Sequence, residues 1–177
     1  MTPEPLEPPA VAALLQSAAA TIHAELAALP VPGLEFHPAE GEWCVKEVLG
    51  HLIECEKRGF SGRIRTILTS EDSPPLEGWD QDAVARARKD CARDWPALYH
   101  ELFELRSVSV GQVAGLSPAD LTRGGQHPKV GFLTVADLLH EWVHHDRNHI
   151  RQMLANVQAF AWPHMGNSRR FSLPTPS

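Results

Sequence analysis

The stretch TVADLLHEWVHHDRNHIRQMLANVQAF, from Thr134 to Phe160, decides the fold. Its apolar residues recur at steps of three and four, which is the period of an amphipathic helix with one buried face. Thr134 stands at the N-cap position and Asp137 follows three residues later, which is the arrangement of a capping box. We therefore predict one long helix over 134–160, and this helix carries four of the ten histidines in the chain.

Two pairs of these histidines have the i and i+4 spacing of metal ligands on a helix, namely His140 with His144 and His145 with His149. Their angles on the helical wheel favour the second pair. At about 100° per residue, His149 lies roughly 70° from the centre of the apolar stripe, His145 roughly 110° and His144 roughly 150°. His144 is thus predicted to face water, and His140 lies at the opposite edge of the stripe.

Asp146 is an unusual residue on this helix, because the wheel places it near the middle of the apolar face. A buried carboxylate needs a compensating partner. Either Asp146 pairs with a cation or a neutral histidine, or the wheel is out of phase at this point.

Three more helices are predicted, over about 9–29, 43–69 and 80–108, with Pro96 kinking or breaking the last one. A single turn is expected at Ser117–Asp120, and no convincing strand is found. Residues 1–9 read as a flexible arm, 10–161 as a single bundle domain and 162–177 as a tail. The predicted fold class is all-α, a four-helix bundle, and such bundles build metal sites from side chains on facing helices.

His51 lies on the second predicted helix, roughly 160° from its apolar stripe. It shares that face with small residues, among them Cys55 and Gly59, and with Cys44 at the expected N-cap. The wheel alone favours a histidine that faces solvent. A face of small residues also leaves room for a ligand, so both interpretations stay open.

The composition limits the classes of function. A formal charge of −6 over 177 residues argues against a nucleic-acid-binding protein, which would show a basic face. The acidic, proline-rich N-terminus is unlike a signal peptide, no apolar run approaches a membrane span, and three scattered cysteines favour a reducing cytoplasm. The chain lacks a nucleophile elbow and a glycine-rich phosphate loop.

Two motifs together resemble a known family. Trp43 followed by CVKEVLGHL, and HDRNH at 145–149 preceded by GFLTVADLLHEW, are similar to the DinB/YfiT-like superfamily of bacterial metal-binding four-helix bundles. The similarity covers roughly residues 10–160. It implies a divalent metal, such as zinc, nickel or iron, held by His51, His145 and His149. It also implies an up-down-down-up bundle, a long connection between the second and third helices, and a homodimer.

The chain departs from the family pattern at Cys44, where a serine or threonine is usual. Three histidines would leave coordination positions for water or substrate, which is typical of catalytic sites. Glu47 and Glu54 near His51, and Asp146 beside His145, are candidates to orient an imidazole. Surface or ion-pair roles are the alternative for each of these carboxylates.

Two functions from different classes follow. The first is a cytoplasmic metal-dependent enzyme acting on a small molecule, either a hydrolase or a transferase of a low-molecular-weight thiol such as bacillithiol or mycothiol, by analogy with relatives. The second is a non-catalytic, dimeric bundle that binds a metal or small molecule in a stress-related role. No catalytic residue beyond the metal ligands is predicted.

Overall fold

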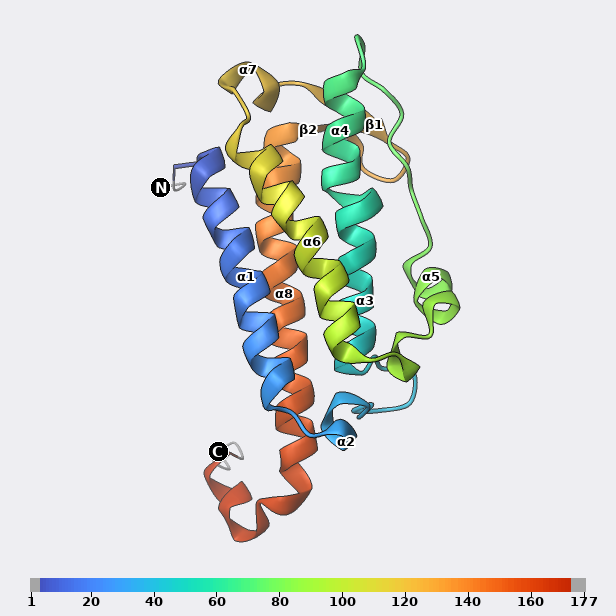
Figure 1. The fold of residues 1–177 in the computed structure, drawn as a ribbon, viewed down its shortest axis with the longest axis vertical. Helices are drawn as coiled ribbons and strands as arrows, with labels where there is room; N and C mark the ends of the chain where they lie inside the picture. The colour runs from blue at the N-terminus through green and yellow to red at the C-terminus, as the bar shows by residue number, and fades with distance from the viewer. Residues whose placement is uncertain (1–3, 173–177) are drawn as a thin grey trace, which may run out of the picture.

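The computed structural model describes residues 4–172 as a four-helix bundle (Figure 1). The four long elements are α1 (Pro8–Ala28), α3 (Val45–Glu54) continued by α4 (Ser61–Thr69), α6 (Trp95–Ala114) and α8 (Val135–Ala161). Helices α1 and α8 run in one direction, and α3 and α6 run in the other (Figure 1). The predicted all-α bundle and its up-down-down-up order are confirmed.

Helix α1 packs against α6 and α8, and it buries a row of apolar side chains that includes Val11, Leu15, Ile22 and Leu26. A proline in its first turn suits a helix start, because a backbone N–H at that position would have no partner within the helix. By length and composition alone α1 is also apolar enough to cross a membrane, contrary to our expectation, although the core helix of a soluble protein passes the same test. The loop that follows contains a short helix, α2 (Val31–Leu34).

The second long helix is not regular, which corrects the prediction of one uninterrupted helix to Thr69. A π-helical turn, η1 (Cys55–Gly59), separates α3 from α4, and the Phe60 N–H donates to the Cys55 carbonyl at 2.8 Å. A Cβ atom at Gly62 would collide with the Lys57 carbonyl oxygen, so a glycine is needed where α4 begins. Such turns occur frequently at functional sites.

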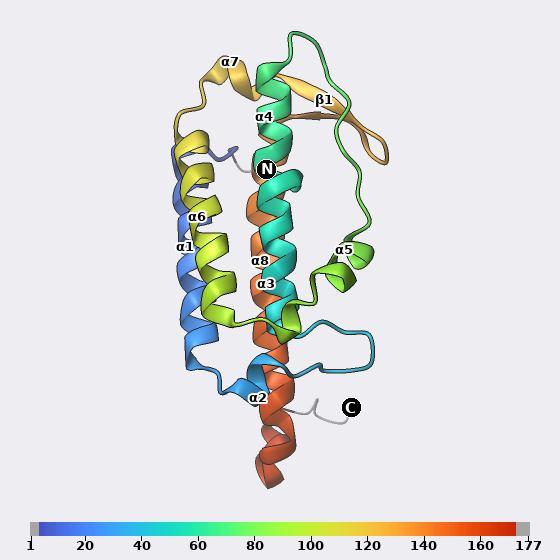
Figure 2. The same ribbon diagram turned by 45° about the vertical axis from the view of Figure 1, so that its right-hand side comes forward.

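The connection between α4 and α6 covers the face of α3 that the wheel assigns to solvent. It contains α5 (Gln81–Arg88) and a 3₁₀ turn, η2 (Asp90–Ala92), and Figure 2 shows α5 beside α3. A Cβ atom at Gly50 would collide with the Asp90 carboxylate, so the two segments touch. The predicted third helix is therefore broken ahead of Pro96, and α6 continues past the predicted end at 108.

A β-hairpin is present where we expected no strand. After the short helix α7 (Pro118–Leu121), β1 (Gly124–His127) pairs antiparallel with β2 (Gly131–Thr134), which leads directly into α8. Strands of four residues are too short to show a period in the sequence, and the glycines of β1 obscure any alternation. The segment expected to be an irregular tail forms two further 3₁₀ turns, η3 (Trp162–His164) and η4 (Gly166–Phe171), and residues 173–177 lie outside the described range.

A buried ion network joins all four helical segments. Arg106 of α6 donates to both carboxylate oxygens of Asp146, at 2.5 and 3.3 Å, and also to Glu56 in the π turn. It donates a further bond to the Leu15 carbonyl of α1. Burial lowers the pKa of Arg106, but the charges of Asp146 and Glu56 outweigh this and raise it. The predicted need of Asp146 for a partner is thus met by a cation.

Removing the cation of this network should destabilise the protein strongly. Arg106→Leu would leave two buried carboxylates without compensation, so the free energy of unfolding in urea should fall by about 3–5 kcal/mol. Glu104→Gln on the same helix, which breaks an exposed pair with His100, should change it by less than about 1 kcal/mol. Equal effects of the two substitutions would contradict the role given to Arg106.

Candidate metal centre

Three histidines predicted as ligands meet inside the bundle. His51 comes from α3, and His145 and His149 come from successive turns of α8. One ring nitrogen of each lies within 4.8 Å of the other two, and the Nε2 atoms of His51 and His145 are 3.0 Å apart. The structure therefore brings together all three residues, and their role as metal ligands stays a prediction.

The competing pair on α8 is not part of this cluster. His144 is exposed, as predicted, and its Nδ1 atom lies 3.1 Å from the Asn148 side-chain nitrogen. His140 accepts a hydrogen bond from the Leu6 N–H at its Nε2 atom. The wheel thus favoured the pair that the structure places in the cluster with His51.

The wheel placed His51 wrongly, because this side chain is only 4% exposed. Its ring lies between two tryptophans, with ring centroids 5.2 Å from Trp43 and 5.8 Å from Trp79. Trp79 belongs to the connection that covers α3. A helical wheel describes one helix and cannot include a cover supplied by another part of the chain.

The histidine cluster is held in its neutral form. Burial, together with the charge of His149, lowers the pKa of His51 to about 3. Burial and the charges of His149 and His51 lower the pKa of His145 to about 2, and burial also lowers the pKa of His149. At neutral pH all three rings therefore keep a lone pair available for a metal ion.

The donor set fits a divalent ion. Zn–N bonds of about 2.0–2.1 Å in tetrahedral geometry separate two ligand nitrogens by roughly 3.3 Å, close to the spacing found here. Gln152 lies 2.9 Å from Nδ1 of His149, which leaves Nε2 of that ring for an ion. The Nδ1 atoms of His51 and His145 are buried and have no partner within the described part of the chain. The Nε2 atoms of these two rings face each other and are the atoms that would hold an ion.

Within the described residues, none of the three candidate carboxylates is hydrogen-bonded to His51, His145 or His149. Asp146 binds Arg106, Glu54 binds Arg88 and Arg58, and Glu47 lies 3.0 Å from His37. Their contacts agree with the alternative interpretation, in which these carboxylates form ion pairs or lie at the surface. Sequence reasoning missed Gln152, although its spacing of three residues from His149 is a usable signal on a helix.

Cys55 is a second residue that sequence reasoning missed. Its Sγ atom lies 3.4 Å from Nε2 of His51 and 3.7 Å from Nε2 of His145. Burial, with the nearby charges of Asp146 and Glu56, raises the pKa of this thiol, so it stays protonated in the absence of a metal. The spacing of four residues from His51 was the signal in the sequence.

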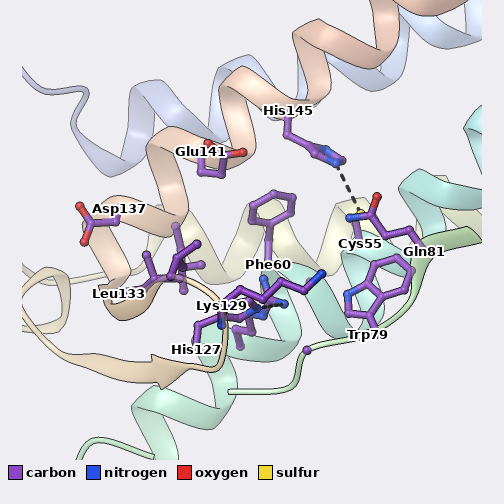
Figure 3. Close-up of a pocket in the computed structure, with 15 residues that line it drawn as sticks. Cys55, Phe60, Trp79, Gln81, His127, Lys129, Leu133, Asp137, Glu141 and His145 are labelled. Atoms are coloured by element: carbon purple, nitrogen blue, oxygen red, sulfur yellow. Dashed lines mark hydrogen bonds between the residues drawn. The ribbon is translucent and has the colours of Figure 1, made fainter. Parts of the chain in front are cut away.

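A cavity of about 620 Å³ opens beside the cluster, and both Cys55 and His145 line it (Figure 3). Phe60, Trp79, Leu133 and Leu138 give it apolar walls. The titratable lining residues fall into two groups. Asp137 and Glu141 project from α8, whereas Lys129 and His127 come from the hairpin (Figure 3). Arg63 of α4 lies with the second group, in which Lys129 and Arg63 are the cations.

Arg63 lacks an acidic partner in this cavity. Its Nη2 atom donates to the Glu77 carbonyl at 2.7 Å and lies 3.2 Å from His127 Nε2, while its Nε atom is buried without a partner. Burial and the charges of Arg63 and Lys129 lower the pKa of His127, so the neutral ring can accept from Arg63. Across residues 4–172, no carboxylate forms an ion pair with Arg63 or Lys129.

Comparison with known proteins gives matches of two kinds. The family model of the DinB superfamily matches residues 13–153. The solved structure of YfiT from Bacillus subtilis, described as a probable metal-dependent hydrolase with an unusual four-helix bundle topology, matches with a TM-score of 0.81 at 20% sequence identity. That match covers 92% of this chain and 94% of the other. No curated protein matches the chain.

The neutral histidines predict how the stability of the metal-free protein depends on pH. In the unfolded chain a histidine takes up a proton near pH 6.5, but folded His145 does so only near pH 2, so acid favours unfolding. Between pH 6 and 4 His145 alone should remove about 1.4 kcal/mol of stability per pH unit. Urea unfolding in the presence of a chelator would measure this loss.

The variant His145→Gln should show a shallower dependence on pH than the unchanged protein. His144→Gln is the matched control, because this neighbouring ring is exposed. If the three proteins lose stability in parallel between pH 6 and 4, burial of neutral His145 does not contribute.

Proposed function

The chain belongs to the DinB superfamily, and from this premise we propose that it is a metal-dependent hydrolase whose divalent ion is held by His51, His145 and His149. The observation that carries the proposal is the convergence of three neutral imidazoles, one of which, His145, lines a cavity large enough for a small molecule. The description of YfiT as a probable metal-dependent hydrolase supports the same reaction class.

A divalent ion in this position would supply Lewis acidity, which polarises a carbonyl or phosphoryl group and activates water. The chain itself would place the substrate. His145 lines the cavity, so a substrate bound there would lie beside the histidines that would hold the ion. Phe60 and Trp79 would exclude bulk water from that group, which strengthens electrostatic interactions within the site.

The cationic wall supports a substrate with an anionic group. A carboxylate or phosphate at Arg63 would satisfy the Nε atom that is buried without a partner. It would also reduce the repulsion between Arg63 and Lys129, both of which line the cavity. A guanidinium suits such groups because its N–H donors match two oxygens at once.

The thiol transferase activity implied by the resemblance stays a prediction, as do the homodimer and the cytoplasmic location. The same ion could activate a bound thiol by lowering its pKa. We favour hydrolysis because it is the reaction class named for the structurally similar protein. The presence or absence of a required thiol separates the two enzymes experimentally.

Removal of one ligand should remove one metal ion. Elemental analysis of purified protein should show that His149→Ala holds one divalent ion fewer per chain than the unchanged protein, because two imidazoles bind an ion far more weakly than three. His144→Ala, which changes an exposed histidine one turn away, should keep the full content. An unchanged metal content in His149→Ala would contradict the proposal that His149 is a ligand of this centre.

Arg63 offers a test of substrate choice that leaves the metal in place. With small carboxylated esters and amides as substrates, Arg63→Leu should raise KM about 10- to 100-fold, which corresponds to a lost charged hydrogen bond of roughly 1.5–3 kcal/mol. Glu141→Gln, on the other wall, should not weaken binding. The metal content of both variants should equal that of the unchanged protein.

The same assays distinguish the competing functions. Turnover that requires added bacillithiol or mycothiol would show a thiol transferase and contradict the proposed hydrolase. Full metal content without turnover of any ester, amide or thiol substrate would favour the non-catalytic bundle. Hydrolysis that survives in His149→Ala at an unchanged rate would show that the reaction does not use this centre.

A further inference from the structure

We propose that this chain binds a second metal ion, of the thiolate-preferring zinc type, through His37, Cys44 and Cys91. One donor atom of each residue lies within 4.8 Å of the other two. The cluster lies at the start of α3, about two helical turns before His51, so it is separate from the three-histidine centre. The proposal does not depend on the proposed hydrolase activity.

The three donors come from three segments that are distant in sequence. His37 lies in the loop after α2, Cys44 is the N-cap residue of α3, and Cys91 lies in the turn η2 of the long connection. In a tetrahedral zinc site with Zn–S bonds of about 2.3 Å and Zn–N bonds of about 2.0 Å, donors lie roughly 3.5–3.8 Å apart. The observed convergence within 4.8 Å needs only small side-chain movements to reach that geometry.

Glu47 provides a second, independent observation at this place. Its Oε2 atom lies 3.0 Å from Nε2 of His37 and accepts a hydrogen bond of 2.9 Å from the Cys44 N–H. One carboxylate thus contacts two of the three proposed ligand residues. In metal sites such a carboxylate either orients an imidazole or serves as a further ligand.

Charge and access are also suitable for a zinc-like ion. Two thiolates and one imidazole around a divalent cation have no net charge, which reduces the cost of placing an ion beside the fully buried Cys44. His37 is exposed and lines a cavity of about 430 Å³ together with Trp43 and Glu47. That cavity gives an ion a path from solvent.

The donor types distinguish this site from the other one. Thiolates select soft ions such as zinc or copper(I), while a set of three imidazoles also accepts nickel and iron. A bound ion would tie the loop after α2 and the long connection to the start of α3. Metal binding by Cys44 would explain why a thiol stands at the N-cap of α3, where a serine or threonine hydroxyl is expected.

Cobalt(II) titration of the reduced, chelator-treated full chain tests the proposal. Cobalt bound by thiolates gives a charge-transfer absorption that cobalt bound by imidazoles alone lacks. The unchanged protein should bind two ions per chain and show this absorption. Cys91→Ser should lose the absorption and one ion, while His149→Ala should lose one ion and keep the absorption.

Cys55→Ser is the matched control, because Cys55 is the thiol beside the three histidines. It should keep the charge-transfer absorption. Cys91 lies in a short turn and is partly exposed, so serine there should preserve the fold, and circular dichroism checks this. If Cys55→Ser abolishes the absorption and Cys91→Ser does not, the thiolate ligand belongs to the other centre and the proposal fails.

A disulfide between Cys44 and Cys91 is the competing use of the same pair. It would lower the mass of the protein by two hydrogen atoms and block cobalt binding until reduction. If the fully reduced protein shows no thiolate absorption and retains all its cobalt in Cys91→Ser, no second site exists. Failure of His149→Ala to lose an ion would affect only the proposed hydrolase.

Discussion

The ion pair between Arg106 and Asp146 is the constraint on which the centre of the molecule depends. Asp146 follows His145 directly, so the direction of its carboxylate sets the rotation of α8 about its own axis. With Asp146 turned toward α6, the ring of the preceding residue, His145, points toward α3 and meets His51. Glu56 binds the same guanidinium from the π turn, so a single buried cation fixes both helices that carry the histidines. The site is therefore preorganised by contacts that lie outside it.

Two electrostatic environments meet where the cavity opens. On the side of the bundle core, burial keeps the three imidazoles neutral and suited to a cation. On the side of the hairpin, Arg63 and Lys129 lack acidic partners in the described chain and are suited to an anion. A substrate with an anionic end and a group that can be cleaved would be oriented by this separation. Orientation of this kind supplies much of the advantage of an enclosed site.

Local sequence patterns were sufficient to predict the bounds of a single helix and the face on which its side chains lie. The period and capping box of 134–160 predicted α8 to within one residue at each end, and the wheel chose His145 and His149 over the competing pair. Contacts between distant segments lay beyond this reasoning. His51 could be placed inside only by a family resemblance, because the rings that cover it, Trp43 and Trp79, come from segments outside its helix. Cys91 was read as part of a continuous helix, since nothing local shows that α5 ends before Pro96. The hairpin is too short to leave a periodic signal.

The π turn at Cys55–Gly59 has a consequence for how such a fold can diverge. A turn of this kind corresponds to one residue inserted into an α-helix. The wider turn takes up the extra residue, so α4 after it can keep its packing in the bundle. Loss of that residue would restore a regular α-helix and change which side chains lie between His51 and Phe60, Cys55 and Glu56 among them. A single insertion or deletion at this turn could thus change the side chains beside the metal ligands and leave the ligands themselves untouched.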